Sequence, residues 1–443
     1  MARKRQLDRE TRVHVTELDA EGVGRGAVDG FDLKVWGALP GETAAVRVLK
    51  RRRNRLETVA EVVADAHADR VRAPCAAAGV CGGCSLQHLA PAAQRAHKRA
   101  RLATLLEEAG LAPPGRWLED LVGPASGYRR KARLGVRHVP ALGGSLVGFR
   151  VRGSGRVVDS ELCLNLVPQV GLQLAALRGL VASLSIPQSV PQIEIAAGDD
   201  DVAIVLRHLA PLTEDDVDRL VAFSERLGWA VWLQPGGPET VERLAPKQGS
   251  GRLHYRLDAF GLRLAFHPTD FTQVNGEINR QLVSRAVELL APTASDAVLD
   301  LFCGLGNFTL PLATRSGEVL GVEGSETLVE RARENAAANG IGSARFETRD
   351  LYADDFDVTS LPSADLLLID PPRSGAGRIA DGIGAGSSLS PRRVVYVSCN
   401  PVSLAEDLAV MTRRGYALSA IGIVDMFPNT SHVESIALLE ARD

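Results

Sequence analysis

The stretch that decides the fold is VLDLFCGLGNFTLPLA, residues 298–313. An apolar run typical of a β-strand leads directly into Gly304-Leu305-Gly306, and a helical segment follows. Glycines at such a junction let the backbone turn tightly and approach a ligand beyond the carboxyl end of the strand. The full dinucleotide fingerprint needs a third glycine, but Phe308 or Thr309 stands at that position. The stretch therefore predicts a cofactor pocket but does not identify the cofactor.

Helix and strand patterns alternate around this stretch, from about residue 276 to the C-terminus. Helical segments such as EINRQLVSRAVELLA (277–291) are amphipathic. Strand segments such as GEVLGVEG (317–324) and ADLLLIDPP (364–372) are mostly apolar on both faces. Strands buried on both faces and separated by helices are typical of a doubly wound parallel sheet. We expect residues 269–443 to form a Rossmann-like α/β domain.

Acidic residues stand at the ends of three of these strands. Glu323 ends a strand 19 residues after Gly304, where a carboxylate is placed to bind ribose hydroxyls. Asp300 precedes the glycines and Asp350 follows a third strand, so we expect all three to face one crevice. Because acids repel phosphates, the crevice favours S-adenosylmethionine over a nicotinamide cofactor.

A fourth strand ends in Asp370-Pro371-Pro372-Arg373. The first three residues resemble the rigid acidic lip that many methyltransferases place beside the acceptor base. Enzymes that methylate an amine usually follow this lip with an aromatic residue that stacks on the base. Arg373 at that position counts against an exocyclic amine as the methyl acceptor.

The fifth strand, VVYVS, ends in Cys399-Asn400-Pro401. A lone cysteine is more often a buried structural residue, but Asn400-Pro401 favours a turn that exposes the sulfur at the edge where the cofactor binds. A thiolate that adds to carbon 6 of uracil makes an enolate, whose carbon 5 can attack a methyl sulfonium. A base must then remove the proton from carbon 5, and His432 or Glu434 could serve.

Four further cysteines predict a metal site. Cys75, Cys81 and Cys84 are spaced C-x5-C-x2-C in a glycine-rich segment, and Cys163 follows much later. Four thiolates suit zinc and an iron–sulfur cluster almost equally. The spacing differs from that of radical S-adenosylmethionine enzymes, which disfavours radical chemistry. Cys303, beside Gly304, is interpreted as a core residue.

The N-terminal two thirds of the chain has a different character. Residues 12–64 alternate apolar and polar residues in short runs separated by glycine-rich turns, which predicts a small β-barrel over residues 1–66. Residues 67–268 mix strand and helix patterns, including a helical segment within 85–110, and predict a mixed α/β central domain.

Composition and charge set the remaining bounds. The chain has 443 residues, 45% of them hydrophobic and 24% charged, which predicts a soluble protein of two or three domains. No run approaches the roughly 18 apolar residues of a membrane span, and the basic start MARKRQLDRE lacks the apolar region of a secretory signal. We expect a cytoplasmic protein. Residues 50–55 and 128–137 each hold five basic residues and no acid. One such run is usually ordinary solvated surface, but two runs make binding of RNA or DNA an equally good interpretation.

Six ordered motifs together resemble the RNA uracil-C5 methyltransferases: DFTQVN, DLFCGLGNFTLPLA, GVEGS, DPPR, VYVSCNP and DMFP…HVE. The resemblance implies Cys399 as nucleophile and Glu434 as base, with His432 only flanking it. It also places Asp370 where cofactor and uracil meet, and implies cofactor contacts from five residues. These are Gln273, Phe302, Asn307, Glu323 and Asp350, although some members have asparagine at the position of Asp350.

The resemblance extends to the rest of the chain. The ribosomal-RNA branch of the family carries a 4Fe–4S cluster on a cysteine pattern like that of Cys75, Cys81, Cys84 and Cys163. Residues 12–64 resemble a TRAM domain, an OB-type RNA-binding barrel. Barrel and cluster together imply 23S ribosomal RNA as partner and uridine 1939 as target. We expect a monomer without an obligatory protein partner. The rival hypotheses are an RNA cytosine-C5 methyltransferase and a non-catalytic ribosome-assembly factor.

Overall fold

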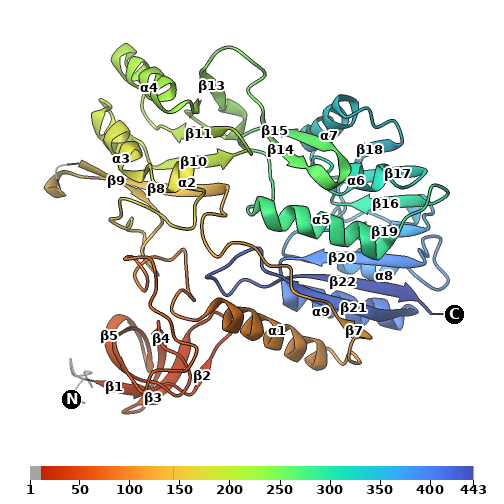
Figure 1. The fold of residues 1–443 in the computed structure, drawn as a ribbon, viewed down its shortest axis with the longest axis horizontal. Coiled ribbons are helices and arrows are strands. Elements are labelled where there is room, and N and C mark those ends of the chain that lie inside the picture. Colours follow the sequence, from red (N-terminus) through yellow and green to blue (C-terminus); the bar gives the residue numbers. More distant parts are fainter. Residues whose placement is uncertain (1–10, 143, 443) are drawn as a thin grey trace.

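The computed structural model describes residues 11–142 and 144–442, with the side chain of Leu142 left out. The basic start of the chain and the first ten residues of the expected barrel lie outside these ranges. The described strands form four sheets, of six, six, two and eight strands. Figure 1 shows the N-terminal sheet at the lower left, the central sheet above it, and the C-terminal sheet with its helices on the right.

The N-terminal region is a six-stranded sheet with the order β1-β5-β6-β4-β3-β2. Alternating residues of its strands, among them Val13, Leu33 and Val35, are buried in one core. This confirms the strands expected within residues 12–64, whereas closure into a TRAM-type barrel stays a prediction. The strands are β1 (Arg12–His14), β2 (Glu17–Leu18), β3 (Gly24–Val28), β4 (Phe31–Trp36), β5 (Thr43–Arg52) and β6 (Arg55–Ala64).

The central region is a second six-stranded sheet, with the order β13-β12-β11-β10-β8-β9. Its helix α4 begins at a capping box, in which the side chains of Thr213 and Asp216 each accept a hydrogen bond from the other residue's backbone N–H. The helix ends at Gly228, which has a left-handed backbone conformation. The elements are β8 (Lys131–Val139), β9 (Gly144–Gly148), α2 (Pro168–Gly171), α3 (Leu174–Ser183), β10 (Gln192–Ala197), β11 (Val202–Arg207), α4 (Glu214–Leu227), β12 (Ala230–Gln234) and β13 (Glu242–Ala245).

The C-terminal region contains an eight-stranded sheet with the order β18-β17-β16-β19-β20-β22-β21-β7. Its first five strands are parallel, as expected for a doubly wound sheet. The strands are β7 (Arg116–Trp117), β16 (Ala297–Leu301), β17 (Glu318–Glu323), β18 (Ala344–Thr348), β19 (Leu366–Ile369), β20 (Arg393–Ser398), β21 (Tyr416–Val424) and β22 (Glu434–Ala441).

The last strand departs from the parallel pattern. β22 lies antiparallel between β20 and β21. Only residues 425–433 connect β21 to β22, and a parallel return needs a crossover of a dozen or more residues. This short connection forces β22 to run in the opposite direction. It also places the start of β22 beside the end of β20.

Helices cover the parallel strands and enclose two large apolar cores, one on each face of the sheet. A two-stranded hairpin, β14 (Leu253–Leu257) and β15 (Leu262–Phe266), packs against α7. The helices are α5 (Gly276–Leu290), α6 (Thr309–Ala313), α7 (Glu326–Ala338), α8 (Gly377–Gly382) and α9 (Pro401–Arg413). The described chain contains no helix long and apolar enough to cross a membrane.

One helix and one strand cross from the predicted central region to the C-terminal sheet. α1 (Pro91–Glu108) packs against α9 and β21, and β7 pairs in parallel with β21. Figure 1 shows α1 running beside the C-terminal sheet. Residues from the first third of the chain therefore reach the sheet that ends the chain, which becomes important for the site.

Candidate active site

The glycine-rich turn after β16 has the backbone conformation that its sequence predicts. Gly304 and Gly306 have φ values of +56° and +92°, and Phe302 is a non-glycine residue at +65°. A Cβ atom on Gly306 would lie 3.2 Å from Leu310 Cγ, whereas one on Gly304 would meet open space. Backbone strain of this kind gathers at ligand sites, and the open space at Gly304 leaves room for a ligand against the backbone.

Glu323 at the end of β17 is fixed toward this turn. Its carboxylate accepts hydrogen bonds from the backbone N–H of Gly304, at 3.1 Å, and of Ser325, at 3.0 Å. Asp350 lies two residues beyond the neighbouring strand β18, where it is exposed and accepts the N–H of Tyr352. The sheet thus brings both acids to its carboxyl edge, as the sequence predicted. The ring of Tyr352 stands 5.5 Å from that of Phe302.

Asp300 is placed differently from the expectation. Its side chain is fully buried, and Thr309 Oγ1 donates to one carboxyl oxygen at 2.5 Å. Asp300 therefore stabilises the turn from the protein interior and does not face the crevice with Glu323. Burial raises the pKa of Asp300 to about 8. Among the described residues, no group hydrogen-bonds the other oxygen.

Asn307 and Gln273 are held by protein partners. The Asn307 amide exchanges two hydrogen bonds with Asn279 of α5 and accepts a third from the Tyr255 hydroxyl, each at 2.9 Å. Gln273 Nε2 lies 3.5 Å from Asp370 Oδ2, which brings together two residues 97 positions apart. Asn279 and Tyr255 were not predicted from the sequence, because nothing in it indicates that α5 and β14 pack on the glycine turn.

Cys399 and Glu434 meet through the antiparallel pairing of β20 and β22. Ser398 pairs with Ser435 at the end of this ladder. Cys399 is the next residue on one strand and Glu434 the preceding residue on the other, so they occupy facing positions. Glu434 is 2% exposed, and Cys399 is half-buried. Residues 35 positions apart in the chain thereby share one edge of the sheet.

The acids around this edge are shifted toward their neutral forms. Removal from water raises the pKa of Asp370 to about 7. Burial, together with the charge of Asp370, raises the pKa of Glu434 well above its ordinary value. The pKa of the Cys399 thiol is raised by burial and by both acids, while Arg373 opposes this rise. Groups with displaced pKa values in one place are typical of catalytic sites.

Arg373 connects three parts of the site. Its backbone carbonyl accepts a hydrogen bond from Asn400 Nδ2 at 2.8 Å, which ties the end of β20 to the loop after β19. Its guanidinium lies 3.2 Å from His432 Nδ1. Because arginine has no acceptor, Nδ1 must accept this bond. In the neutral ring, Nδ1 is then the only basic nitrogen, and Arg373 already occupies it. This favours Glu434 over His432 as the base.

The four cysteines expected to bind metal are brought into one neighbourhood. Burial raises the pKa of Cys81 and Cys163, and that of Cys84 to about 12, and the neighbouring thiols raise these values further. Asn165 Nδ2 donates to Cys84 Sγ at 3.1 Å. Arg152 donates to the backbone carbonyls of Cys81 and Cys84. Within residues 11–142 and 144–442, no group of three or more histidine, cysteine or acidic side chains could hold a metal ion.

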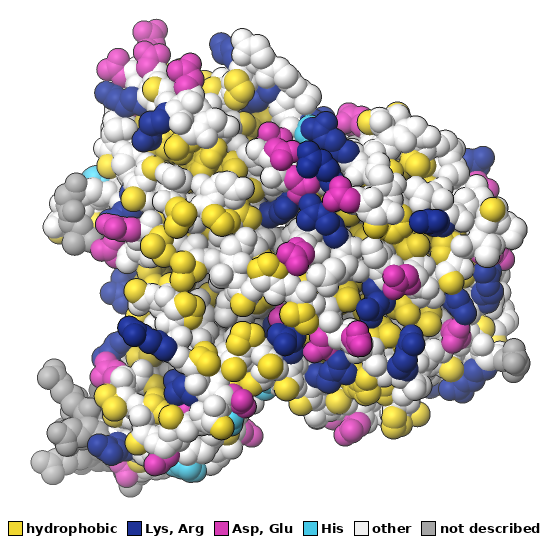
Figure 2. All heavy atoms as spheres, in the orientation of Figure 1, with side chains coloured by type: hydrophobic (Ala, Val, Ile, Leu, Met, Phe, Trp, Pro, Cys, Tyr) yellow, Lys and Arg dark blue, Asp and Glu magenta, His cyan; other side chains and the backbone are white. Residues whose placement is uncertain are grey.

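The two basic runs differ in accessibility. Residues 50–55 form the exposed tip of β5 and β6, and Lys50, Arg52 and Arg55 line a groove of about 790 Å³. In the second run, Arg130 pairs with Asp199 at 2.5 Å and Lys131 donates to the carbonyl of Pro268 at 2.8 Å. These two cations are occupied within the protein. Figure 2 shows basic side chains interspersed with acidic and apolar ones over the face of the molecule that it draws.

Comparison with known proteins places the chain in a family. A profile described as tRNA (uracil-5-)-methyltransferase matches residues 260–442. The 23S rRNA (uracil(1939)-C(5))-methyltransferase RlmD of Hahella chejuensis is 45% identical over 444 residues, which cover 99% of each chain. The RlmD of Alkalilimnicola ehrlichii is 48% identical over 447 residues, or 100% of this chain and 99% of that protein.

A solved structure shares the fold. The tRNA (uracil-54, C5)-methyltransferase of Pyrococcus abyssi, in complex with S-adenosyl-L-homocysteine, superimposes with a TM-score of 0.70. The two chains are 22% identical, and the match covers 97% of this chain and 100% of the other. Since the curated relatives match over the full length, the chain belongs to the RNA uracil-C5 methyltransferase family.

Proposed function

We propose that this protein methylates carbon 5 of uridine 1939 in 23S ribosomal RNA, with S-adenosylmethionine as methyl donor. The observation that carries the proposal is that Cys399 and Glu434 occupy facing positions just beyond the Ser398–Ser435 pair, at the carboxyl edge of the sheet that also carries the strained glycine turn. It is supported by full-length relatives that bear this activity in their names.

The residues present fit S-adenosylmethionine. Gly304 offers open space against the backbone, and Glu323 holds a carboxylate beside it for the ribose hydroxyls. We assign the remaining cofactor contacts to Phe302, Asn307 and Asp350, with Gln273 and Asp370 at the side facing Cys399. When bound, S-adenosylmethionine supplies an electrophilic methyl group.

The reaction begins with the Cys399 thiolate. Its sulfur adds to carbon 6 of uracil, and the electron pair of the 5,6 double bond moves toward carbon 4, whose carbonyl oxygen takes the charge of the enolate. Carbon 5 then takes the methyl group from the sulfonium, whose sulfur keeps the bonding electron pair and leaves as the thioether of S-adenosylhomocysteine. Glu434 removes the proton from carbon 5, the double bond re-forms, and the sulfur leaves carbon 6 as a thiolate. The target uridine must leave its stack to reach the half-buried sulfur.

The surroundings of Glu434 suit this task. A carboxylate that is removed from water binds a proton more tightly than an exposed one, because burial disfavours its charge. Burial also raises the pKa of Asp370 to about 7, so this side chain is only partly ionised at neutral pH. Arg373 stabilises the Cys399 thiolate and counteracts the acids. We expect turnover to rise with pH as Cys399 and Glu434 lose their protons.

We also propose that Cys75, Cys81, Cys84 and Cys163 hold a 4Fe–4S cluster. Cys75, Cys81 and Cys163 each raise the pKa of Cys84, so the four thiols lie close together, and hydrogen-bond donors face Cys81 and Cys84. Four thiolates suit zinc and an iron–sulfur cluster almost equally, and the resemblance to the ribosomal-RNA branch of the family favours the cluster. A colourless protein with stoichiometric zinc would overturn this assignment.

The remaining assignments extend this proposal. Residues 1–66 form a TRAM-type RNA-binding domain, residues 67–268 the cluster-bearing domain and residues 269–443 the methyltransferase domain. The exposed run at residues 50–55 contacts RNA phosphates. A cytoplasmic location and a monomeric state stay predictions.

The experiment that tests the proposal is mapping of 5-methyluridine in 23S ribosomal RNA from a strain that lacks the protein. The methyl group at uridine 1939 should disappear, return with the wild-type protein, and stay absent with Cys399→Ala. Methylation of a cytidine would identify the cytosine-C5 rival. Restoration by Cys399→Ala would contradict the covalent mechanism and favour a non-catalytic role.

A further inference from the structure

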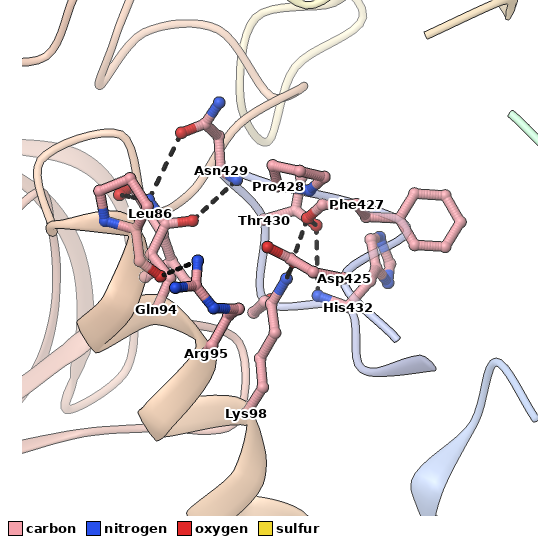
Figure 3. A network of polar contacts seen from close by, with 12 residues as sticks. Leu86, Gln94, Arg95, Lys98, Asp425, Phe427, Pro428, Asn429, Thr430 and His432 are labelled. Carbon is pink, nitrogen blue, oxygen red and sulfur yellow. Dashed lines mark hydrogen bonds and ion pairs between the residues drawn. The ribbon is translucent and has the colours of Figure 1, made fainter. Parts of the chain in front are cut away.

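A lysine of α1 lies buried against the loop that leads into the proposed base. Lys98 is 1% exposed, and a lysine is almost never buried without a partner. Its Nζ donates to Asp425 Oδ1 at 2.7 Å and to the carbonyl oxygen of Phe427 at 3.0 Å. Figure 3 shows Lys98 pointing from α1 toward these two residues. Both belong to residues 425–433, which we call the base loop because it leads into Glu434.

The base loop is short and tightly connected to Glu434. Val424 pairs with Glu434 at the start of the β21–β22 ladder, so Asp425 is the first residue beyond that pair. The positive charge of Lys98 lowers the pKa of Glu434, against the opposing effects of burial and Asp370. Lys98 therefore acts on Glu434 in two ways: it holds the loop that leads into it, and it places a cation nearby.

Anchoring alone does not explain a buried cation. Gln94, one turn earlier on α1, already binds the base loop: its Oε1 accepts the backbone N–H of Asn429 at 2.8 Å. Burying an ion pair costs desolvation energy, and apolar residues of similar volume usually stabilise a fold at least as well. A lysine at this position is therefore better explained by its charge than by its packing.

We propose that Lys98 is a positioning residue for the proton-abstraction step, which fixes the base loop that leads into Glu434 and supplies a buried cation near it. This rests on the proposed function, because it takes Glu434 as the base. In the step, the proton on carbon 5 passes to the Glu434 carboxylate and the Cys399 sulfur leaves carbon 6. Lys98 keeps its own proton throughout.

The charges that act on Glu434 give the sign of the effect. Asp370 faces it from the loop after β19, Cys399 from the end of β20, and Lys98 from α1. In Lys98→Met, Asp370 remains and Asp425 loses its partner, so both act against ionisation of Glu434. In the pH profile of the elimination rate, the acid limb should move up by about one pH unit. Below that limb, the elimination rate of Lys98→Met should be about tenfold lower than that of the wild type.

The test follows the covalent intermediate, because a merely structural residue would not affect it selectively. Lys98→Met is mixed with a 23S ribosomal RNA fragment and S-adenosylmethionine, and products are separated on a denaturing gel. Addition and methyl transfer do not use Glu434, so a methylated RNA–protein adduct should accumulate about tenfold over wild type. Arg95→Met is the matched control: this α1 cation lies 3.9 Å from Asp120, and its variant should give no more adduct than the wild type.

Three results decide the outcome. Adduct from Lys98→Met, together with the shifted pH limb, supports the proposal. Activity loss without adduct, or wild-type turnover with an unshifted limb, overturns it. If Lys98→Met does not fold, the double variant Lys98→Met/Asp425→Asn leaves no uncompensated charge and is judged by the same criteria. RNA containing 5-fluorouridine traps wild-type enzyme independently; absence of that adduct would show that the proposed function itself has failed.

Discussion

The glycine turn and the base loop lie at the same edge of one sheet, but they are fixed in opposite ways. The turn is held by residues from the second half of the chain: Thr309 bonds Asp300, nine residues away, and Asn279 and Tyr255 bond Asn307, 28 and 52 residues away. The base loop is held by residues from the other end of the chain: Gln94 and Asn429 are 335 positions apart. The cofactor side of the site is thus built within the second half of the chain, whereas the proton-abstracting side depends on the docking of α1 from the first third.

The segment with the cysteines also takes part in this docking. The backbone N–H groups of Ser85 and Leu86, directly after Cys84, both donate to the carbonyl oxygen of Asn429. Ser85 Oγ in addition accepts the N–H of Ser431 at 3.1 Å. The cysteine segment therefore contacts the base loop directly, and the two proposed centres share a structural connection.

The largest expected effect comes from Glu434→Gln. Glutamine keeps the shape of the side chain but cannot accept the proton from carbon 5, so turnover should fall by about 10²- to 10⁴-fold. The Cys399–RNA adduct should accumulate, while binding of S-adenosylmethionine by calorimetry stays within twofold of wild type, about 0.4 kcal/mol. Loss of cofactor binding would show that the two sides of the site are not independent.

The next effect concerns Asn429, which has a φ of +67° and whose Nδ2 donates to the carbonyl of Ala125 at 2.6 Å. Asn429→Ala and Asn429→Gly both lose this bond, so each should lower the free energy of unfolding by about 1–3 kcal/mol. The alanine variant should lose about 1 kcal/mol more, because glycine tolerates positive φ. Denaturant titration measures both, and equal values would exclude a backbone contribution at this position.

A matched pair of substitutions probes the glycine turn. Gly306→Ala places a Cβ 3.2 Å from Leu310 Cγ, so it should mainly lower stability, by about 1–2 kcal/mol. Gly304 also has a positive φ, so Gly304→Ala should lose about 1 kcal/mol of stability as well. Its Cβ fills the open space beside the backbone, so it should in addition weaken S-adenosylmethionine binding, which Gly306→Ala should not. Thermal unfolding and calorimetry separate the two. If Gly304→Ala binds the cofactor normally, the cofactor does not occupy that space.

The smallest effect is a pH dependence at the opposite edge of the sheet. Arg392 hydrogen-bonds Asp296 through two contacts of 2.9 Å and lowers the pKa of Asp296 to about 2. A depressed pKa contributes stability that is present above the ordinary value near 4 and is lost as pH falls toward 2. Because Arg392 is half exposed, we expect only about 1 kcal/mol. In Arg392→Met, denaturant stability should fall less steeply between these pH values.

The comparison also explains what the sequence could predict. Strand–glycine–helix order and the acids at strand ends are local patterns, and they predicted the turn, Glu323 and the parallel strands. The same patterns did not distinguish Asp300, which is buried, from Glu323, because both precede a turn. The second basic run likewise gave no sign that Arg130 and Lys131 bind partners within the protein, since Asp199 and Pro268 lie far along the chain.

The base loop was beyond sequence reasoning for a related reason. Its geometry depends on the antiparallel insertion of β22 and on α1, whose partner could not be identified from the helix itself. One signal was present: Gln94, Lys98, Leu102 and Leu106 recur every four residues and form the buried face of α1. Two polar residues in an otherwise apolar face indicate a polar partner, but only the structure identifies it as residues 425–433.

The most direct test of the account is a trapping experiment with a 23S ribosomal RNA fragment that carries 5-fluorouridine at position 1939. Fluorine on carbon 5 cannot be removed as a proton, so the wild-type enzyme should stop as a covalent complex after methyl transfer. We predict an RNA–protein species on a denaturing gel whose RNA is attached to the peptide that contains Cys399. Attachment at another residue, or methylation-competent enzyme that forms no adduct, would contradict the covalent mechanism.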